Sequence, residues 1–176
     1  MLILNGMKIN IRKVGFKMKD VVEIRIDDRL IHGQVAGLWT NTLNATRIMV
    51  IDDEVSADQA QKQLLRMVAP STVKTSIISE DKAFNNLKDN RYQGQRVFIL
   101  VKTPLVIKRL FDKGLEISRI NLGNISQKEG RVQFRPGISL SIEESNALKS
   151  MIEKGIKVTA KKIPTDPEVI IRTEEL

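Results

Sequence analysis

The sequence predicts a doubly wound α/β domain built on a mainly parallel sheet. Apolar runs of strand length alternate with segments of helical period, and most of these runs are continuously apolar. Continuously apolar strands need cover on both faces, so we expect helices on both sides of the sheet. With 176 residues and 41% hydrophobic residues, the chain can bury one substantial core. We therefore expect about seven strands in a single domain over residues 21–176.

The predicted strands are short runs rich in Val and Ile. In chain order they are residues 21–27, 47–52, 73–79, 96–101, 118–124 and 156–164. Residues 125–141 contain short extended pieces within a loop, a pattern compatible with a hairpin. The strands after residue 124 are the least sharply defined by their pattern.

The helices are predicted from capping residues and apolar periodicity. A helix over residues 33–43 follows the first strand. Four further helices have an N-terminal signal: Ser56 before residues 57–68, Ser79 before residues 80–87, Thr103 with Pro104 before a helix that ends at Gly114, and Ser141 before residues 142–155. Each helix lies between two predicted strands, as a doubly wound fold requires.

The first 20 residues differ from the rest of the chain in charge. They hold half of the net charge of +8, through Lys8, Arg12, Lys13, Lys17 and Lys19 against Asp20. Because Met18 offers an alternative start immediately before the first strand, we expect residues 1–20 to be a basic leader, flexible or non-native. The remaining domain is only mildly basic. A non-catalytic basic α/β module that binds nucleic acid is therefore the alternative hypothesis and not the leading one.

Several classes of protein are disfavoured by what the sequence lacks. It contains no cysteine, which excludes disulfides and thiolate chemistry, and no apolar run approaches the roughly 20 residues that span a bilayer. A chain that does not itself span the membrane, in the cytoplasm, is the simplest expectation. The turn after the first strand matches neither common nucleotide-binding glycine motif. With a single histidine, we also expect no metal site and no cofactor.

The candidate chemistry lies in the stretch "RIDDRLIHGQV", residues 25–35, which holds His32. In an open α/β sheet, ligands bind beyond the carboxyl ends of the strands, and this is the first such loop. Histidine is a suitable nucleophile toward phosphorus. Arg29 is the obvious partner for a phosphate, and Asp27 or Asp28 is placed to hold one imidazole nitrogen so that the other can attack.

A purely structural interpretation of the same residues is also available. Histidine near the start of a helix is often only a polar residue of the cap region, and Arg29 with Asp27 or Asp28 can be a surface ion pair of small energetic value. A histidine phosphatase is a further alternative, but it needs an arginine directly before the histidine and a second histidine. Ile31 precedes His32, and the chain has no other histidine.

The loop resembles that of the IIB components of the mannose/fructose/sorbose family of the bacterial sugar phosphotransferase system (PTS). The motif "RIDDRLIHGQV" is followed by Trp39, five residues after Gln34. Further similar motifs are "DDEVSADQ", "MVAP", "VKTP", "RINLGN" and "PTDP". The resemblance covers about residues 21–170, and "VKTP" with "RINLGN" is most similar to N-acetylgalactosamine-type members.

The resemblance implies a phosphoryl carrier. His32 is then the phosphorylated residue, through Nδ1, and receives the group from a phosphohistidine of the IIA component. Asp27 would orient the loop and Arg29 would neutralise charge. Gln34, Gly33 and Asp28 would support the loop or the phosphate. Because two proteins must exchange the group, His32 is expected on an accessible, fairly flat surface.

The same resemblance implies partners and a location. The phosphoryl group would pass to a hexose or amino sugar held by the membrane components IIC and IID, so the chain would be cytoplasmic and peripherally associated with them. Homo-oligomerisation is left open. One position departs from the family: its arginine of the second helix falls at or beside Gln61, and Lys62, or else Arg66, would take its place.

Overall fold

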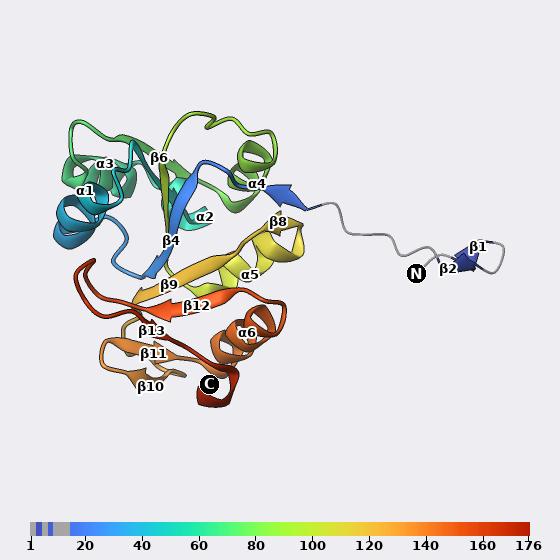
Figure 1. Ribbon diagram of the computed structural model, residues 1–176. Helices are drawn as coiled ribbons and strands as arrows, with labels where there is room; N and C mark the ends of the chain where they lie inside the picture. Colours follow the sequence, from blue (N-terminus) through green and yellow to red (C-terminus); the bar gives the residue numbers. More distant parts are fainter. Residues whose placement is uncertain (1–2, 5–6, 9–14) are drawn as a thin grey trace.

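The computed structural model describes residues 3–4, 7–8 and 15–176, and its centre is a seven-stranded sheet (Figure 1). The strand order is β13-β12-β9-β4-β7-β5-β6. Six strands run parallel: β4 Val21–Asp27, β5 Arg47–Ile51, β6 Lys74–Ile78, β7 Val97–Val101, β9 Arg119–Asn124 and β12 Lys157–Ala160. The edge strand β13, Val169–Ile170, is antiparallel to β12. The predicted fold class is confirmed.

Short strand pairs outside the main sheet account for the other strands. β10 Val132–Arg135 and β11 Ile138–Leu140 form the hairpin that residues 125–141 indicated. β1 Ile3–Leu4 pairs with β2 Met7–Lys8. β3 Phe16–Lys17 pairs in parallel with β8 Leu115–Glu116. Strand β3 thus joins the end of the predicted leader to the domain, whereas residues 1–2, 5–6 and 9–14 of that leader lie outside the described residues.

Helices cover both faces of the sheet. On one face, the π-helix η1 Val35–Trp39 and the helices α1 Thr40–Thr42, α2 Asp53–Ala57 and α3 Gln59–Val68 pack on a core that includes Ile48, Val50, Phe98 and Leu100. On the other face, α4 Glu80–Lys88, α5 Pro104–Asp112 and α6 Ile142–Glu153 pack on Ile24, Ile26, Met49 and Ile99. A 3-10 helix, η2 Thr173–Glu175, lies near the C-terminus. The two cores explain why the neighbouring strand β7 is continuously apolar.

The predicted helix starts are right in three cases and wrong in one. Ser79, Thr103 and Ser141 each accept a backbone hydrogen bond as N-caps. Ser56 does not cap a helix over residues 57–68. The segment is instead two helices, with Asp52 as the N-cap of α2 and Asp58 as the N-cap of α3. Asp58 has an extended backbone (ψ 109°) that interrupts the helix, and its carboxylate accepts from the N–H groups of Ala60 and Gln61.

The predicted helix over residues 33–43 is wound as a π-helix in its middle. Both the backbone N–H and the hydroxyl of Thr40 donate to the Val35 carbonyl oxygen, the hydroxyl at 2.7 Å. This wider turn begins three residues after His32 and places Val35, Ala36 and Trp39 in the core. π-Helical turns are rare and are often found at functional sites.

The topology places the end of β4 at a switch point. From β4 the chain continues into η1 on one face, and from the neighbouring strand β7 it continues into α5 on the other face. Connections that diverge in this way leave a crevice beyond the carboxyl ends of the two strands. The loop with His32 begins there.

Candidate functional site

The loop after β4 is held in a defined shape by two buried residues. Leu30 has a left-handed backbone (φ 58°), its N–H donates to the Asp27 carbonyl oxygen at 2.9 Å, and its side chain is only 3% exposed. Ile31 is equally buried in the same core. Because the residues on its N-terminal side are anchored, His32 has a fixed position at the surface, with 21% of its side chain exposed.

Asp27 is the centre of the charged group beside His32. Its side chain has no exposure, and both of its oxygens accept hydrogen bonds from Arg29: Nε to Oδ1 at 2.9 Å and Nη2 to Oδ2 at 3.0 Å. The Arg29 side chain remains 42% exposed. Its hydrogen bonds to Asp27 raise the pKa of Arg29. The arginine is therefore held at its base and still open to a ligand from solvent.

A second arginine, Arg25, binds the same carboxylate from the protein interior. Arg25 is fully buried, and its Nε and Nη2 donate to Asp27 Oδ2 at 3.2 and 2.8 Å. Its Nη1 donates to the Lys161 carbonyl oxygen at 2.8 Å, and its guanidinium lies 4.8 Å from the centre of the Trp39 ring. Burial lowers the pKa of Arg25, and the Asp27 charge opposes that effect. Two arginines thus share one carboxylate, so Arg25, Asp27 and Arg29 together carry one excess positive charge.

The two nitrogens of His32 have different surroundings. Nδ1 lies 2.9 Å from the Leu30 carbonyl oxygen, and since a carbonyl only accepts, Nδ1 carries a proton in this orientation. Nε2 is enclosed, has no hydrogen-bond partner among the described residues, and lies 4.0 Å from Asp27 Oδ2. Attack by Nδ1 therefore requires the ring to leave the Leu30 carbonyl.

Asp28 points away from the imidazole and ties the loop to β9. Its carboxylate accepts from the Ser126 N–H at 2.8 Å, the Ser126 hydroxyl at 3.2 Å and Asn124 Nδ2 at 3.0 Å. Burial alone would raise the pKa of Asp28, but these hydrogen bonds outweigh it and lower the pKa. Of the two aspartates left open by the sequence, the structure brings only Asp27 toward His32.

Next to Asp28, Arg131 and Glu144 form a second ion pair that is largely buried. Arg131 lies 3.9 Å from Asp28, donates to the Ser126 carbonyl oxygen at 3.0 Å, and binds both oxygens of Glu144. Glu144 also accepts from Thr103 Oγ1 at 2.8 Å. This chain of contacts fixes the β9–β10 loop against the starts of α5 and α6.

Of the remaining predicted residues, Gly33 and Gln34 directly follow His32, whereas Lys62 makes its contact elsewhere. Gly33 and Gln34 are exposed at the start of the helix after His32, where backbone N–H groups are free for an anion. Lys62 donates through Nζ to the Ser56 carbonyl oxygen at 2.9 Å, at the junction of α2 and α3. The structure therefore brings His32, Asp27 and Arg29 together, while Lys62 is engaged elsewhere.

Sequence reasoning missed Arg25, Ser126, Asn124 and Arg131. A signal for Arg25 existed: in "VVEIRID", Glu23, Arg25 and Asp27 alternate with Ile24 and Ile26, so the charged residues share one face of the strand. For the other three, no local signal exists, because they lie about 100 residues beyond the loop in the chain and reach it only through the pairing of β9 with β4.

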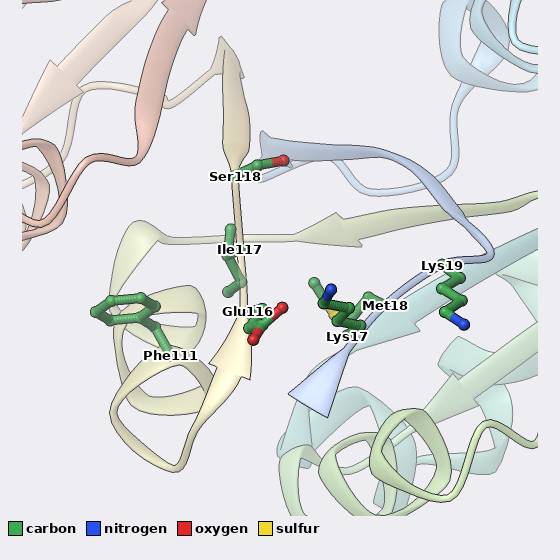
Figure 2. Close-up of a pocket in the computed structure, with 7 residues that line it drawn as sticks. All are labelled: Lys17, Met18, Lys19, Phe111, Glu116, Ile117 and Ser118. Atoms are coloured by element: carbon green, nitrogen blue, oxygen red, sulfur yellow. The ribbon is translucent and has the colours of Figure 1, made fainter. Parts of the chain in front are cut away.

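A hollow on the surface lies away from this group. Figure 2 shows that it is lined by Lys17, Met18, Lys19, Phe111, Glu116, Ile117 and Ser118. Most of these residues directly precede β4 and β9, so the hollow is at the amino ends of the strands, opposite to the carboxyl ends where His32 lies. Within the described residues, no three histidine, cysteine or carboxylate side chains converge as a metal site would require.

The fold and this site define a class: a doubly wound α/β protein with a surface histidine and an arginine at the carboxyl end of its first central strand. Residues 21–173 match the profile of the family described as the PTS system sorbose subfamily IIB component. The chain belongs to this family.

Individual relatives agree. The sorbose-specific EIIB component of Lacticaseibacillus casei is 32% identical over 154 residues, which cover 86% of this chain and 94% of the relative. The crystal structure of the IIBSor domain of the sorbose permease from Klebsiella pneumoniae has a TM-score of 0.83 and 31% identity, and the match covers 89% of this chain and 95% of that one.

The mannose-specific EIIAB component of Escherichia coli K12 is 37% identical over 145 residues, 82% of this chain. This chain spans only 45% of that relative. Matching relatives carry the names of mannose, sorbose, fructose and N-acetylgalactosamine, and nothing in the comparisons supports a nucleic-acid-binding module. Over the described residues, no helix has the length and apolar character needed to span a bilayer.

Proposed function

We propose that this chain is the phosphoryl carrier IIB of a sugar phosphotransferase system and that His32 carries the group. The observation that supports this most directly is that His32 and Arg29 lie at the same carboxylate. Both oxygens of Asp27 hold Arg29, which stays exposed, and His32 Nε2 lies 4.0 Å from Asp27 Oδ2. An exposed, oriented guanidinium next to a histidine is suited to a dianionic phosphoryl group.

The proposed reaction has two transfers. Once the Nδ1 proton has been exchanged through solvent for a proton on Nε2, the Nδ1 lone pair of His32 attacks phosphorus. The P–N bond to the donor histidine of IIA breaks, and the electron pair of that bond returns to the donor. In the second transfer, a sugar hydroxyl oxygen attacks the same phosphorus, and the P–N bond to His32 breaks. The hydroxyl proton leaves to solvent or to the released imidazole. Arg29 compensates the phosphoryl charge in both steps.

Neighbouring residues have supporting roles in this proposal. Asp27 orients Arg29, and Asp28 anchors the loop. Gly33 and Gln34 present N–H groups and an amide to the phosphoryl oxygens. Lys62 can contribute only after it releases the Ser56 carbonyl. Comparison of Lys62→Gln with Arg66→Gln in a phosphorylation assay tests which of the two basic residues of α3 takes part: a slower rate in only one variant identifies it.

We infer the partners and the location from the same assignment. A IIA component would donate the group, and membrane components IIC and IID would present a hexose or amino sugar, with the chain bound peripherally at the cytoplasmic side. The similarity of "VKTP" and "RINLGN" to N-acetylgalactosamine-type members favours an amino sugar. Transport assays with sugars of both classes in cells that carry the matching IIC and IID would identify the substrate.

The central test is phosphorylation of the purified chain by a phosphorylated IIA protein. We expect a label that is lost in acid and stable in alkali, as for a phosphoramidate, and we expect no label in His32→Gln. Asn41→Gln, an exposed change in α1, is the control and should label normally. A label that persists in His32→Gln would contradict the proposal.

A further inference from the structure

Arg25 is the site's buried arginine and, unlike Arg29, cannot contact a ligand from solvent. Its side chain has no exposure, yet it makes two of the hydrogen bonds to Asp27 Oδ2. We propose that Arg25 is a positioning residue: it fixes the Asp27 carboxylate, and through it the Arg29 guanidinium, in the orientation that receives a phosphoryl group at His32. This inference rests on the proposed function.

The hydrogen bonds at Asp27 show how the positioning works. Oδ2 accepts two bonds from Arg25 and one from Arg29, while Oδ1 accepts from Arg29 Nε and, at 3.3 Å, from the Arg29 N–H. With these bonds in place, the carboxylate has little freedom to rotate toward His32 Nε2, 4.0 Å away. Asp27 therefore binds Arg29 and does not form a close ion pair with the imidazole.

The site of Arg25 is shaped for a guanidinium. A Cβ atom added to Gly123 would lie 2.0 Å from Arg25 Cζ, so only glycine leaves room for this side chain. Trp39 covers the guanidinium and donates through Nε1 to the Lys162 carbonyl oxygen at 3.0 Å, next to the Lys161 carbonyl that Arg25 binds. The space left by Gly123, the Trp39 ring and the Lys161 carbonyl together hold Arg25 in one position.

Charge gives Arg25 a second effect on the reaction. Asp27 with Arg29 alone would be neutral, whereas Arg25, Asp27 and Arg29 together carry one excess positive charge. Because the incoming phosphoryl group is dianionic, this excess stabilises it, and the charge of Arg25 is little screened since its side chain is fully buried. Loss of Arg25 should therefore slow the chemical step without weakening the docking of a protein donor.

The experiment compares Arg25→Lys and Arg25→Met with the unchanged chain. Two donors are used: a phosphorylated IIA protein and phosphoramidate, a small molecule that needs no docking surface. We expect both variants to be phosphorylated about tenfold to a hundredfold more slowly by either donor, with the KM for the IIA protein changed less than about threefold. The lysine variant should be faster than the methionine variant because it keeps the positive charge. It should still be slower than the unchanged chain because it cannot form the paired hydrogen bonds to Asp27.

Arg47 provides a matched control. It is a partly buried arginine on an aromatic ring, 5.2 Å from the Tyr92 ring centre, and it donates to Gln95 and Ser76 at 2.7 Å, away from the His32 loop. Arg47→Lys and Arg47→Met should lower stability without slowing the phosphorylation of folded protein. Equal slowing in the Arg47 and Arg25 variants would overturn a specific role for Arg25.

Gly123→Ala tests the inference if the Arg25 variants fail to fold. This change keeps the arginine and its charge but displaces the guanidinium, so we expect slower phosphorylation by both donors. Unchanged rates in Gly123→Ala or in the Arg25 variants would overturn the positioning role while leaving the carrier function intact. If neither donor labels the unchanged chain, the proposed function is overturned, and this inference with it.

Discussion

His32 Nδ1 lies 2.9 Å from the carbonyl oxygen of Leu30, two residues earlier in the same loop, while His32 Nε2 is enclosed. A donor can reach Nδ1 once the ring leaves this carbonyl, but Nε2 faces the interior beside Asp27. We therefore expect the phosphoryl group on Nδ1. Because the chain has one histidine, ¹⁵N-labelled protein gives a single imidazole pattern in long-range ¹H–¹⁵N spectra. A phosphorus coupling at Nε2 would contradict this prediction.

Asp28→Asn should lower stability and leave the chemistry almost unchanged. The charged carboxylate accepts three hydrogen bonds from Asn124 and Ser126, and weakening them should cost about 1 to 3 kcal/mol of unfolding free energy, measured in urea. The phosphorylation rate of the folded variant should stay within about threefold, whereas Asp27→Asn should lose far more because Arg29 depends on it. Equal losses of rate in the two variants would show that Asp28 also acts on the site.

The stability given by Asp28 should depend on pH in a defined direction. Since hydrogen bonds hold its folded pKa below the unfolded value, the contribution is fully present above the unfolded pKa and is lost as pH falls through the folded pKa. We expect the difference in unfolding free energy between the unchanged chain and Asp28→Asn to be largest near neutral pH and to shrink in acid. A difference that grows in acid would have the wrong sign.

Glu23→Gln should stabilise the protein at neutral pH. Burial raises the pKa of Glu23, and the charge of Arg119, 3.6 Å away, offsets this only in part. The ionised form is therefore disfavoured in the fold, and its cost appears as pH rises from the unfolded pKa through the folded pKa. At pH 7 we therefore expect a higher Tm for Glu23→Gln than for the unchanged chain in thermal unfolding. The gain should vanish below pH 4; a gain that persists there would point to packing instead of charge.

Ser141→Ala tests the start of α6. The Ser141 hydroxyl accepts from the Glu144 N–H at 3.1 Å, and Glu144 Oε2 accepts from the Ser141 N–H at 3.0 Å. Loss of this capping box should reduce the unfolding free energy by about 0.5 to 2 kcal/mol in urea titration. Ser145→Ala, in the first turns of the same helix, is the control and should have a smaller effect. The reverse order would contradict the cap assignment.

Elements with strong local signals could be predicted from the sequence. The apolar runs of β5, β6 and β7 and the caps Ser79, Thr103 and Ser141 depend on neighbours in the chain, and the predictions agree with the structure. The break at Asp58 was missed because the helical period continues across it, although its backbone is extended. β13 has two residues and depends on its register with β12, which no local pattern reveals.

In the candidate site, too, contacts between residues close in sequence could be predicted, and contacts made through strand pairing could not. His32, Arg29 and Asp27 lie within six residues, so their proximity follows from the loop alone. Ser126 and Arg131 approach through the pairing of β4 with β9, and the Arg25 site requires Gly123 on that second strand. Long-range register decides these contacts, and it is a property of the folded sheet.

The sharing of Asp27 by two arginines has a consequence for the energetics of the carrier. Arg25 and Arg29 repel each other across a single carboxylate, and the dianionic group proposed on His32 would relieve this repulsion. The phosphorylated chain should accordingly be the harder of the two forms to unfold. By thermodynamic linkage, whatever stability the group adds to the fold is subtracted from the driving force with which His32 passes it on.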